Sequence, residues 1–311
     1  MSFAKSFIAL FVAFQTSLVS ASSLDNYMRA PDLTIGFEDF SVVLEGVCNA
    51  GFAEYCQNLA FSLERRKDAT KNADRIKRLH QSALKAYENG CLEGNLLPCQ
   101  EASHIYQLGY GVPKNQIKAN DLRDTFNSIA KMQCGAKIAL ACAYQSYWHN
   151  GSGNKEYDAH KAQKYSDLSV EYFDKSCVDQ VAISCALLAQ RFKNGRSYGG
   201  FIDYDIDRSL SLFNKSCALG YANACIEIGS MYFSGKYVGR DKLKAAQYDQ
   251  KGCELGNAIA CRNLLDSGGM TPKGAKRGKA ETAQLRDRIL RLAKDNCATG
   301  KLAECSLFNI K

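Results

Sequence analysis

The stretch "CALGYANAC" runs from Cys217 to Cys225, and "CELGNAIAC" runs from Cys253 to Cys261. Each stretch holds two cysteines eight positions apart. The 311-residue chain has 14 cysteines, and every one belongs to a pair with this spacing. The first cysteines of successive pairs are separated by 43, 43, 43, 40, 36 and 44 residues. A fixed local spacing inside a period of about 40 residues is typical of a repeat array.

Each pair predicts two helices joined by a tight loop. The residues before a first cysteine are amphipathic, as in "KAQKYSDLSVEYFDKSC" (161–177), where aromatic residues such as Tyr165 and Tyr172 recur at helical spacing. A glycine three residues after the first cysteine ends this helix in five of the units. Lys137 and Gln180 stand there instead in the third and fourth units, so we expect those two loops to be built differently.

A second helix is predicted to start after the loop and to carry the second cysteine in about its first turn. Asn257 is a suitable N-cap for one of these helices, and Pro98 sits where a first helical turn tolerates proline. Four residues after the second cysteine the side chain is small in five units, which lets the neighbouring helix approach closely. These small residues are Ala60, Ser103, Ser146, Ala189 and Gly229.

The two cysteines of a pair therefore face each other across one loop, and we expect each pair to close on itself. Pairing between units would need a long-range geometry that an array cannot supply seven times. The predicted disulfides are Cys48–Cys56, Cys91–Cys99, Cys134–Cys142, Cys177–Cys185, Cys217–Cys225, Cys253–Cys261 and Cys297–Cys305. Each closed loop contributes about 2.5 kcal/mol in the loop-entropy model. The bridges thus compensate for the small core of a single hairpin.

The first residues predict export. Lys5 supplies a positive charge, residues 7–14 form an apolar run, and Val19 and Ala21 fit the positions before a cut after Ala21. A membrane anchor is the alternative, but polar residues from Gln15 end the apolar run far short of about 20 residues. No later segment could span a bilayer. We therefore expect a periplasmic or secreted protein, in which thiols pair and stay paired.

The phrase "YF.KSC.LG…AC..IG.MY.SG..V..D..KA" resembles Sel1-like repeats, and the paired cysteines narrow the resemblance to the helical cysteine-rich proteins of bacteria. The resemblance implies an all-α, right-handed α/α superhelical solenoid related to tetratricopeptide arrays. We expect a signal peptide over 1–21 and one solenoid over 22–311. Its hairpins are expected at about 33–66, 74–111, 117–153, 158–196, 205–238, 241–268 and 280–311.

A superhelical array binds protein or peptide partners on its concave face. The resemblance places the helix after the second cysteine on that face, and the residue after each small position is expected to point into the groove. The candidate contacts are Phe61, His104, Tyr147, Gln190, Ser230 and Asp266, together with Tyr144 and Trp148 from the aromatic stretch "AYQSYWHNGSGNK". Packing between repeats is the alternative for the aromatic residues.

We therefore predict an exported scaffold that binds a protein or peptide partner or a cell-wall-related ligand, and not nucleic acid, because an exported chain without a recognition module is unsuited to it. The resemblance implies two alternatives. One is β-lactam binding or weak β-lactamase activity, as described for the cysteine-rich family. The other is an assembly factor of the mitochondrial intermembrane space, which also resembles this family in animals.

Enzymatic motifs are weak. S-x-x-K occurs at Ser82–Lys85 and Ser152–Lys155, without a following S-D-N or K-[ST]-G. We therefore assign no catalytic residue, although the resemblance leaves β-lactamase activity open. The four histidines show no metal-binding spacing, and the cysteine spacing is not that of a zinc knuckle, so no metal or other cofactor is predicted. The basic stretch "MTPKGAKRGKAE" (270–281) is expected to be a solvated turn or to meet an anionic partner.

Overall fold

A computed structural model describes residues 37–151, 157–195, 202–266 and 271–298. Within these residues the regular elements are α-helices and one short 3-10 helix. They are α3 (Phe37–Asn49), α4 (Ala53–Glu64), η2 (Ala69–Asn72), α5 (Ala73–Leu92), α6 (Leu96–Leu108), α7 (Gln116–Gly135), α8 (Ala139–Asn150), α9 (Ala159–Val178), α10 (Ala182–Asn194), α11 (Ile206–Ala218), α12 (Ala222–Ser234), α13 (Lys242–Glu254), α14 (Ala258–Asp266) and α15 (Lys279–Ala298). The predicted all-α solenoid is confirmed. The predicted signal peptide lies outside the described residues.

The loops inside the hairpins share one backbone conformation. Gly94 has φ of 84°, its N–H donates to the carbonyl of Cys91, and the N–H of the next residue donates to Gly90. This pattern caps the end of a helix through a left-handed residue. Lys137 and Gln180 also have positive φ, at 64° and 65°, and their N–H groups make the equivalent bonds. The expectation of differently built loops is therefore wrong, because these side chains accept the left-handed conformation at a small cost in strain.

Six of the seven predicted disulfides are present. They are Cys48–Cys56, Cys91–Cys99, Cys134–Cys142, Cys177–Cys185, Cys217–Cys225 and Cys253–Cys261, with Cα atoms 4.6 to 4.9 Å apart. Each joins the last turn of one helix to the first turn of the next, as the spacing predicts. The seventh predicted pair, Cys297–Cys305, falls outside the described residues because Cys305 does.

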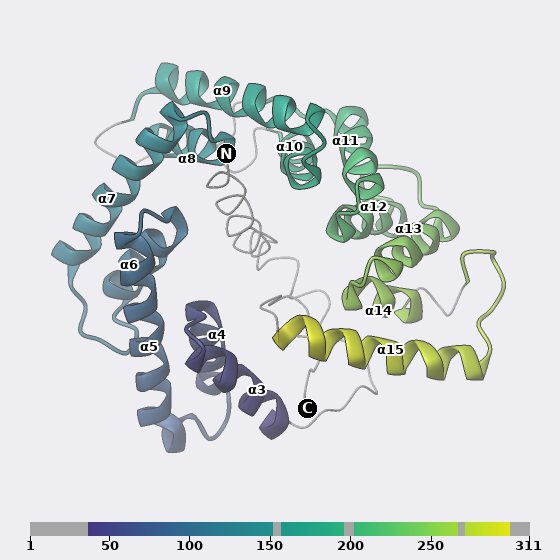
Figure 1. Ribbon diagram of the computed structural model, residues 1–311, viewed down its shortest axis with the longest axis horizontal. Coiled ribbons are helices and arrows are strands. Elements are labelled where there is room, and N and C mark those ends of the chain that lie inside the picture. The colour runs from purple at the N-terminus through teal and green to yellow at the C-terminus, as the bar shows by residue number, and fades with distance from the viewer. Residues whose placement is uncertain (1–36, 152–156, 196–201, 267–270, 299–311) are drawn as a thin grey trace, which may run out of the picture.

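The hairpins follow one another around a ring (Figure 1). The helices that end at a first cysteine, α5, α7, α9, α11 and α13, form its outer row. The helices that carry the second cysteine, α4, α6, α8, α10, α12 and α14, lie on the inner side. α15 returns beside α3, and buried residues of both ends, including Leu44 and Ile289, belong to one hydrophobic cluster. The inner side of the ring is therefore formed by one kind of helix.

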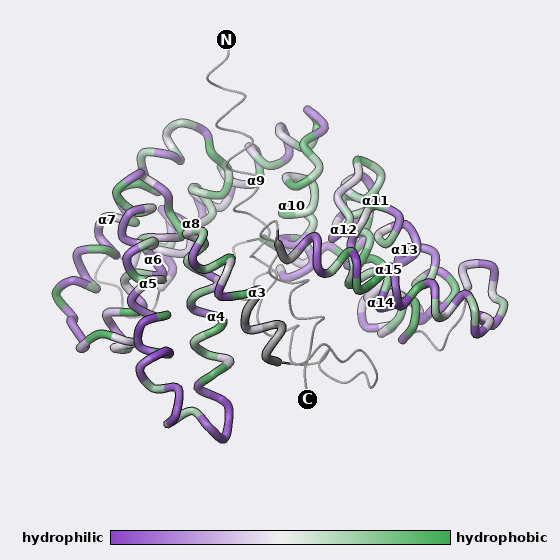
Figure 2. The backbone as a smooth tube through the Cα atoms, turned by 60° about the horizontal axis from the view of Figure 1, so that its bottom comes forward, coloured by the Kyte–Doolittle hydropathy of each residue, from purple (hydrophilic) through white to green (hydrophobic). Residues whose placement is uncertain are grey.

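Close contact between neighbouring hairpins depends on the predicted small residues. Ser103 Oγ donates to the carbonyl of Ala119 at 2.7 Å, and Ser146 Oγ donates to that of Ala162 at 2.8 Å, both on the next outer helix. Figure 2 shows hydrophilic and hydrophobic residues alternating along outer helices such as α5 and α7. Their apolar side faces the inner helices, and the opposite face of each inner helix is turned toward the interior of the ring.

Candidate functional site on the inner helices

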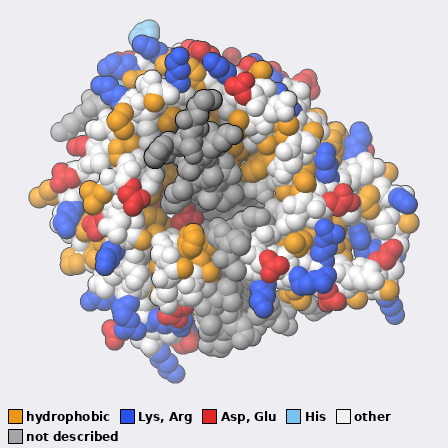
Figure 3. All heavy atoms as spheres, viewed as in Figure 1, with side chains coloured by type: hydrophobic (Ala, Val, Ile, Leu, Met, Phe, Trp, Pro, Cys, Tyr) orange, Lys and Arg blue, Asp and Glu red, His pale blue; other side chains and the backbone are white. Residues whose placement is uncertain are grey.

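The inner helices carry few charged residues. Among Asp, Glu, Lys and Arg, α8 has none, α6 has only Glu101 and α12 has only Glu227. The outer helix α5 alone carries six such residues and α15 carries eight. In Figure 3 many of the Lys and Arg side chains on this face lie along its rim, over the outer helices. The net positive charge of the chain therefore does not extend to the inner face.

The structure places six of the eight candidate contacts of the sequence on the four inner helices α6, α8, α10 and α12. His104 on α6 is exposed, and Tyr147 on α8 is 65% exposed. Tyr144, Trp148, Gln190 and Ser230 are half-buried. Tyr144 packs edge-on against Phe126 of α7 with ring centroids 5.3 Å apart, so it also serves the packing of that hairpin. Their contact with a ligand stays a prediction.

Phe61, the first member of the predicted row, lies in an aromatic cluster. Its ring meets His80 at 5.2 Å and Tyr110 at 5.0 Å, and His80 stacks on Tyr110. His80 is 1% exposed, and its Nε2 lies 2.9 Å from Glu64 Oε1. This cluster joins α4, α5 and the turn after α6. Phe61 therefore has a packing role between repeats.

Three polar positions of the hairpins, two on inner helices and one on an outer helix, were missed by sequence reasoning. The first is Glu227 of α12, whose Oε2 lies 2.6 Å from Lys193 Nζ of α10. The side chain of Lys193 is only 11% exposed, and its ammonium lies 5.6 Å from the ring centroid of Phe213. A carboxylate and a ring face therefore hold one cation between neighbouring inner helices.

The second position is Glu101 of α6, which is half-buried. It makes no hydrogen bond or ion pair within the described parts of the chain. Burial raises the pKa of this carboxyl, which the nearby His104 opposes. Burial, and then the charge of Glu101, raise the pKa of Tyr144 to about 12. Burial and the charge of Glu101 also raise the pKa of Tyr87, and the charge of Glu54 adds to this increase. Glu101 therefore lies near both phenols.

The third position is Asp249 of α13, which is 3% exposed. Asn263 Nδ2 donates to its Oδ1 at 3.1 Å. Burial raises the pKa of Asp249 to about 7, and the charge of Asp266 acts in the same direction. A Cβ at Gly229 would lie 2.8 Å from the same Oδ1, so this close approach of α12 and α13 requires the glycine. The sequence signal that could have found all three is their fixed distance from a cysteine. Glu101 and Glu227 follow a second cysteine by two residues, and Asp249 precedes a first cysteine by four.

The catalytic motifs considered from the sequence do not gather into a site. Ser82 and Lys85 are both exposed on the outer helix α5, and the second Ser–Lys pair lies outside the described residues. No three His, Cys, Asp or Glu side chains gather as metal ligands in the described ranges. None of the helices in the part of the chain that the structure describes is long and apolar enough to cross a membrane.

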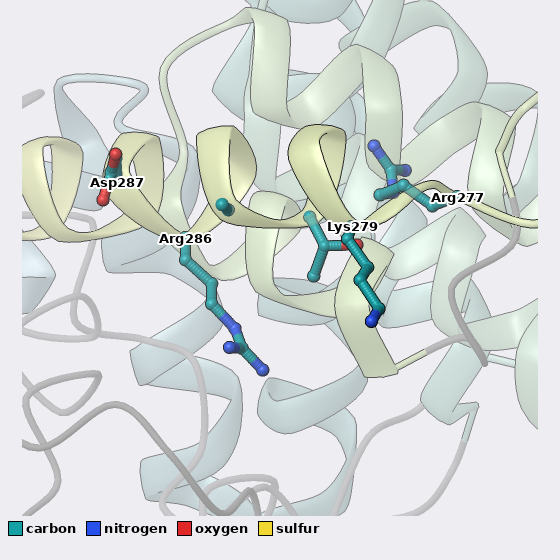
Figure 4. A pocket seen from close by; sticks show the side chains of 6 residues that line it. Arg277, Lys279, Arg286 and Asp287 are labelled. Atoms are coloured by element: carbon teal, nitrogen blue, oxygen red, sulfur yellow. The ribbon is translucent and has the colours of Figure 1, made fainter.

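The basic stretch before α15 forms the edge of a shallow hollow of about 360 Å³. It is lined by Arg277, Lys279, Thr282, Ala283, Arg286 and Asp287. Figure 4 shows Lys279 and Arg286 pointing to one side of α15, whereas Arg277 points to the other side. The three cations therefore do not converge on one point, and the hollow does not form an anion site.

Parts of this chain are similar to known proteins in sequence and in structure. A Sel1 repeat family model matches residues 101–122, 182–221 and 222–257. Cytochrome c oxidase assembly factor 7A of Xenopus laevis is 34% identical over 86 residues, which span 28% of this chain and 35% of that protein. A crystal structure of a Sel1 repeat protein from Oxalobacter formigenes is 17% identical with a TM-score of 0.39, covering 81% of this chain and 99% of that one. Helicobacter pylori cysteine rich protein B is 21% identical with a TM-score of 0.29, covering 46% and 95%.

The family match coincides with the geometry of the fold. The matched ranges contain α10, α11, α12 and α13, most of α6 and the start of α7, which are helices of the repeating hairpins. The remaining described hairpins share the same cysteine spacing and the same loop conformation. Sel1 repeats are therefore recognised in the matched residues, and the unmatched described hairpins have the same build.

Proposed function

We propose that this chain is an exported scaffold whose inner face binds a protein or peptide partner. One observation carries the proposal: disulfide-stapled helices present a charge-poor face on which aromatic and amide side chains remain accessible, with Tyr147 65% exposed. Aromatic side chains supply much of the binding energy at protein interfaces, and a rigid surface loses little entropy on binding. Six disulfides in the described residues favour an oxidising compartment.

The test is a selection of displayed peptides on the immobilised, oxidised chain, followed by titration of one selected peptide. Tyr147→Ala should weaken its binding about tenfold, the effect of losing a well-placed aromatic contact. Tyr157→Ala is the matched control, because Tyr157 is similarly exposed, at 60%, but precedes the outer helix α9. Equal binding by the wild type and Tyr147→Ala, or an equal loss in Tyr157→Ala, would refute the inner face as the site.

A second candidate is favoured by the match to an assembly factor. The 34% identity to Cytochrome c oxidase assembly factor 7A covers only about a third of that protein. A role in assembling a respiratory complex would require a different compartment from the one proposed above. Restored cytochrome c oxidase activity in cells that lack the factor would support this second role. A mature N-terminus at Ser22 in an exported fraction would support the first.

β-Lactam binding or hydrolysis is tested with a chromogenic β-lactam. The described inner helices present no Ser–Lys pair of the S-x-x-K type. Turnover by the oxidised chain that disappears on reduction would favour an activity that depends on the folded array. The absence of turnover would leave the binding scaffold as the better account.

A further inference from the structure

Two glutamates occupy the same place in different repeats. Glu101 and Glu227 each follow the second cysteine of their hairpin by two residues, on the inner helices α6 and α12. An aromatic ring occupies one position of the paired outer helix, four residues before its first cysteine. That ring is Tyr87 in α5 and Phe213 in α11, and both are buried. The repeat therefore brings a carboxylate and a ring together twice.

At Glu227 the chain supplies a cation itself. Lys193 belongs to the preceding inner helix and follows its second cysteine by eight residues. Its ammonium meets the Glu227 carboxylate at 2.6 Å and the ring of Phe213 at 5.6 Å. Such a pair is strong because the cation is largely withdrawn from water and both partners attract it. This arrangement shows which ligand the repeat position accepts.

At Glu101 that cation is missing. The position equivalent to Lys193, eight residues after Cys56 on α4, is Glu64, which is another acid and lies against His80. Glu101 has no hydrogen-bond or ion-pair partner in the described ranges, although it is half-buried beside Tyr87 and Tyr144. A partly buried carboxylate without a partner is costly, so a cation that reaches it from outside gains more than it would at a fully solvated acid.

We propose that Glu101 is a subsite for a lysine or arginine side chain of the bound partner, whose cation takes the place that Lys193 takes at Glu227. The proposal rests on the proposed function, because it assigns the chemistry of one partner residue at the inner face. The charge of Glu101 acts on the phenols of Tyr87 and Tyr144, and His104, three residues further on, is exposed. A metal ion is a poor alternative, since the described residues gather no set of three ligands here.

The experiment uses ten-residue peptides displayed on phage and selected on the immobilised, oxidised full chain. Selected peptides should share a lysine or arginine at one position. Replacing that residue by norleucine should weaken binding to the wild type about tenfold or more. The same replacement should change binding to Glu101→Gln by less than about twofold, because the charge that it meets is gone. Glu171→Gln is the matched control on the exposed surface of α9, and it should behave like the wild type.

A second variant supplies the cation for Glu101 from the protein itself. Glu64→Lys places an ammonium at the position of Lys193, and it should compete with the cationic peptide and weaken its binding about tenfold. Glu64→Gln removes the same negative charge without adding a cation, and it should bind like the wild type. Selected peptides without a shared cation, or equal binding by Glu101→Gln and Glu171→Gln, would overturn the cation subsite. If the selected peptides bind Tyr147→Ala as tightly as the wild type, the inner face is not the binding site, and the proposed function itself is refuted.

Discussion

The α10–α12 and α4–α6 regions are built from equivalent hairpins and carry opposite charges at one position, eight residues after the second cysteine. In the first, Lys193 neutralises Glu227 over the ring of Phe213. In the second, Glu64 stands where the lysine would be, and Glu101 has no hydrogen-bond or ion-pair partner in the described chain. The comparison shows that the repeat sets the positions of the groups. On the proposal above, the residue eight positions after the second cysteine decides whether this carboxylate pairs inside the protein or with the partner.

The α13–α14 hairpin is a third version of the same site. Asp249 takes the position of Phe213 and Tyr87, and Asn263 takes the position of the two glutamates. The acid has therefore moved from the inner helix to the outer helix, where it is 3% exposed and accepts a hydrogen bond from Asn263. Equivalent positions therefore hold three different chemical arrangements in hairpins that share the same disulfide.

The largest expected effect comes from removing the disulfide that closes the hairpin in each region. The double variant Cys91→Ala with Cys99→Ala should lose about 2–5 kcal/mol in free energy of unfolding, and Cys217→Ala with Cys225→Ala should lose a similar amount. The reason is that each bridge closes a short loop and its cysteines are at most 3% exposed. Urea unfolding of both variants measures the loss. Clearly unequal losses would show that the disulfide does not stabilise the two hairpins in the same way.

The next effect concerns the buried acid of the third version. An unfolded aspartate has a pKa near 4, whereas burial raises the pKa of Asp249 to about 7 in the folded protein. The folded state therefore keeps a proton that the unfolded state has lost. The free energy of unfolding should fall by about 2–4 kcal/mol as the pH rises from 4 to 7, and it should not fall further above pH 7 on account of this group.

Asp249→Asn tests this effect. The variant should be more stable than the wild type at pH 8, and the advantage should shrink toward pH 4, as followed by thermal unfolding across the pH range. Asp124→Asn changes an exposed aspartate on α7 and should leave the wild-type profile in place. A wild-type profile in Asp249→Asn would show that Asp249 is ionised without cost in the folded protein.

Much of this architecture could be predicted from the sequence because cysteine spacing is a local signal. The hairpins, six disulfides and the Asn257 cap, which accepts bonds from the N–H groups of Ile259 and Ala260, follow from it. The left-handed Lys137 and Gln180 could not be predicted, since most residues avoid that conformation. Glu101 and Glu227 were missed for another reason. Their difference depends on residues of the preceding repeat, and only packing brings those residues to them.

The smallest effect separates the two regions most directly. Lys193→Met keeps an apolar stem over Phe213 but leaves Glu227 without its cation, so it should lose about 1–2 kcal/mol in free energy of unfolding. Glu101→Gln removes a charge that has no partner in the described chain, and it should leave stability unchanged or raise it slightly. Lys175→Met, on the exposed surface of α9, controls for the loss of a lysine. Urea unfolding should therefore show a loss of stability in Lys193→Met and none in Glu101→Gln. A loss in Glu101→Gln as large as that in Lys193→Met would mean that Glu101 already has an internal partner, and the distinction between a filled and an open cation site would be lost.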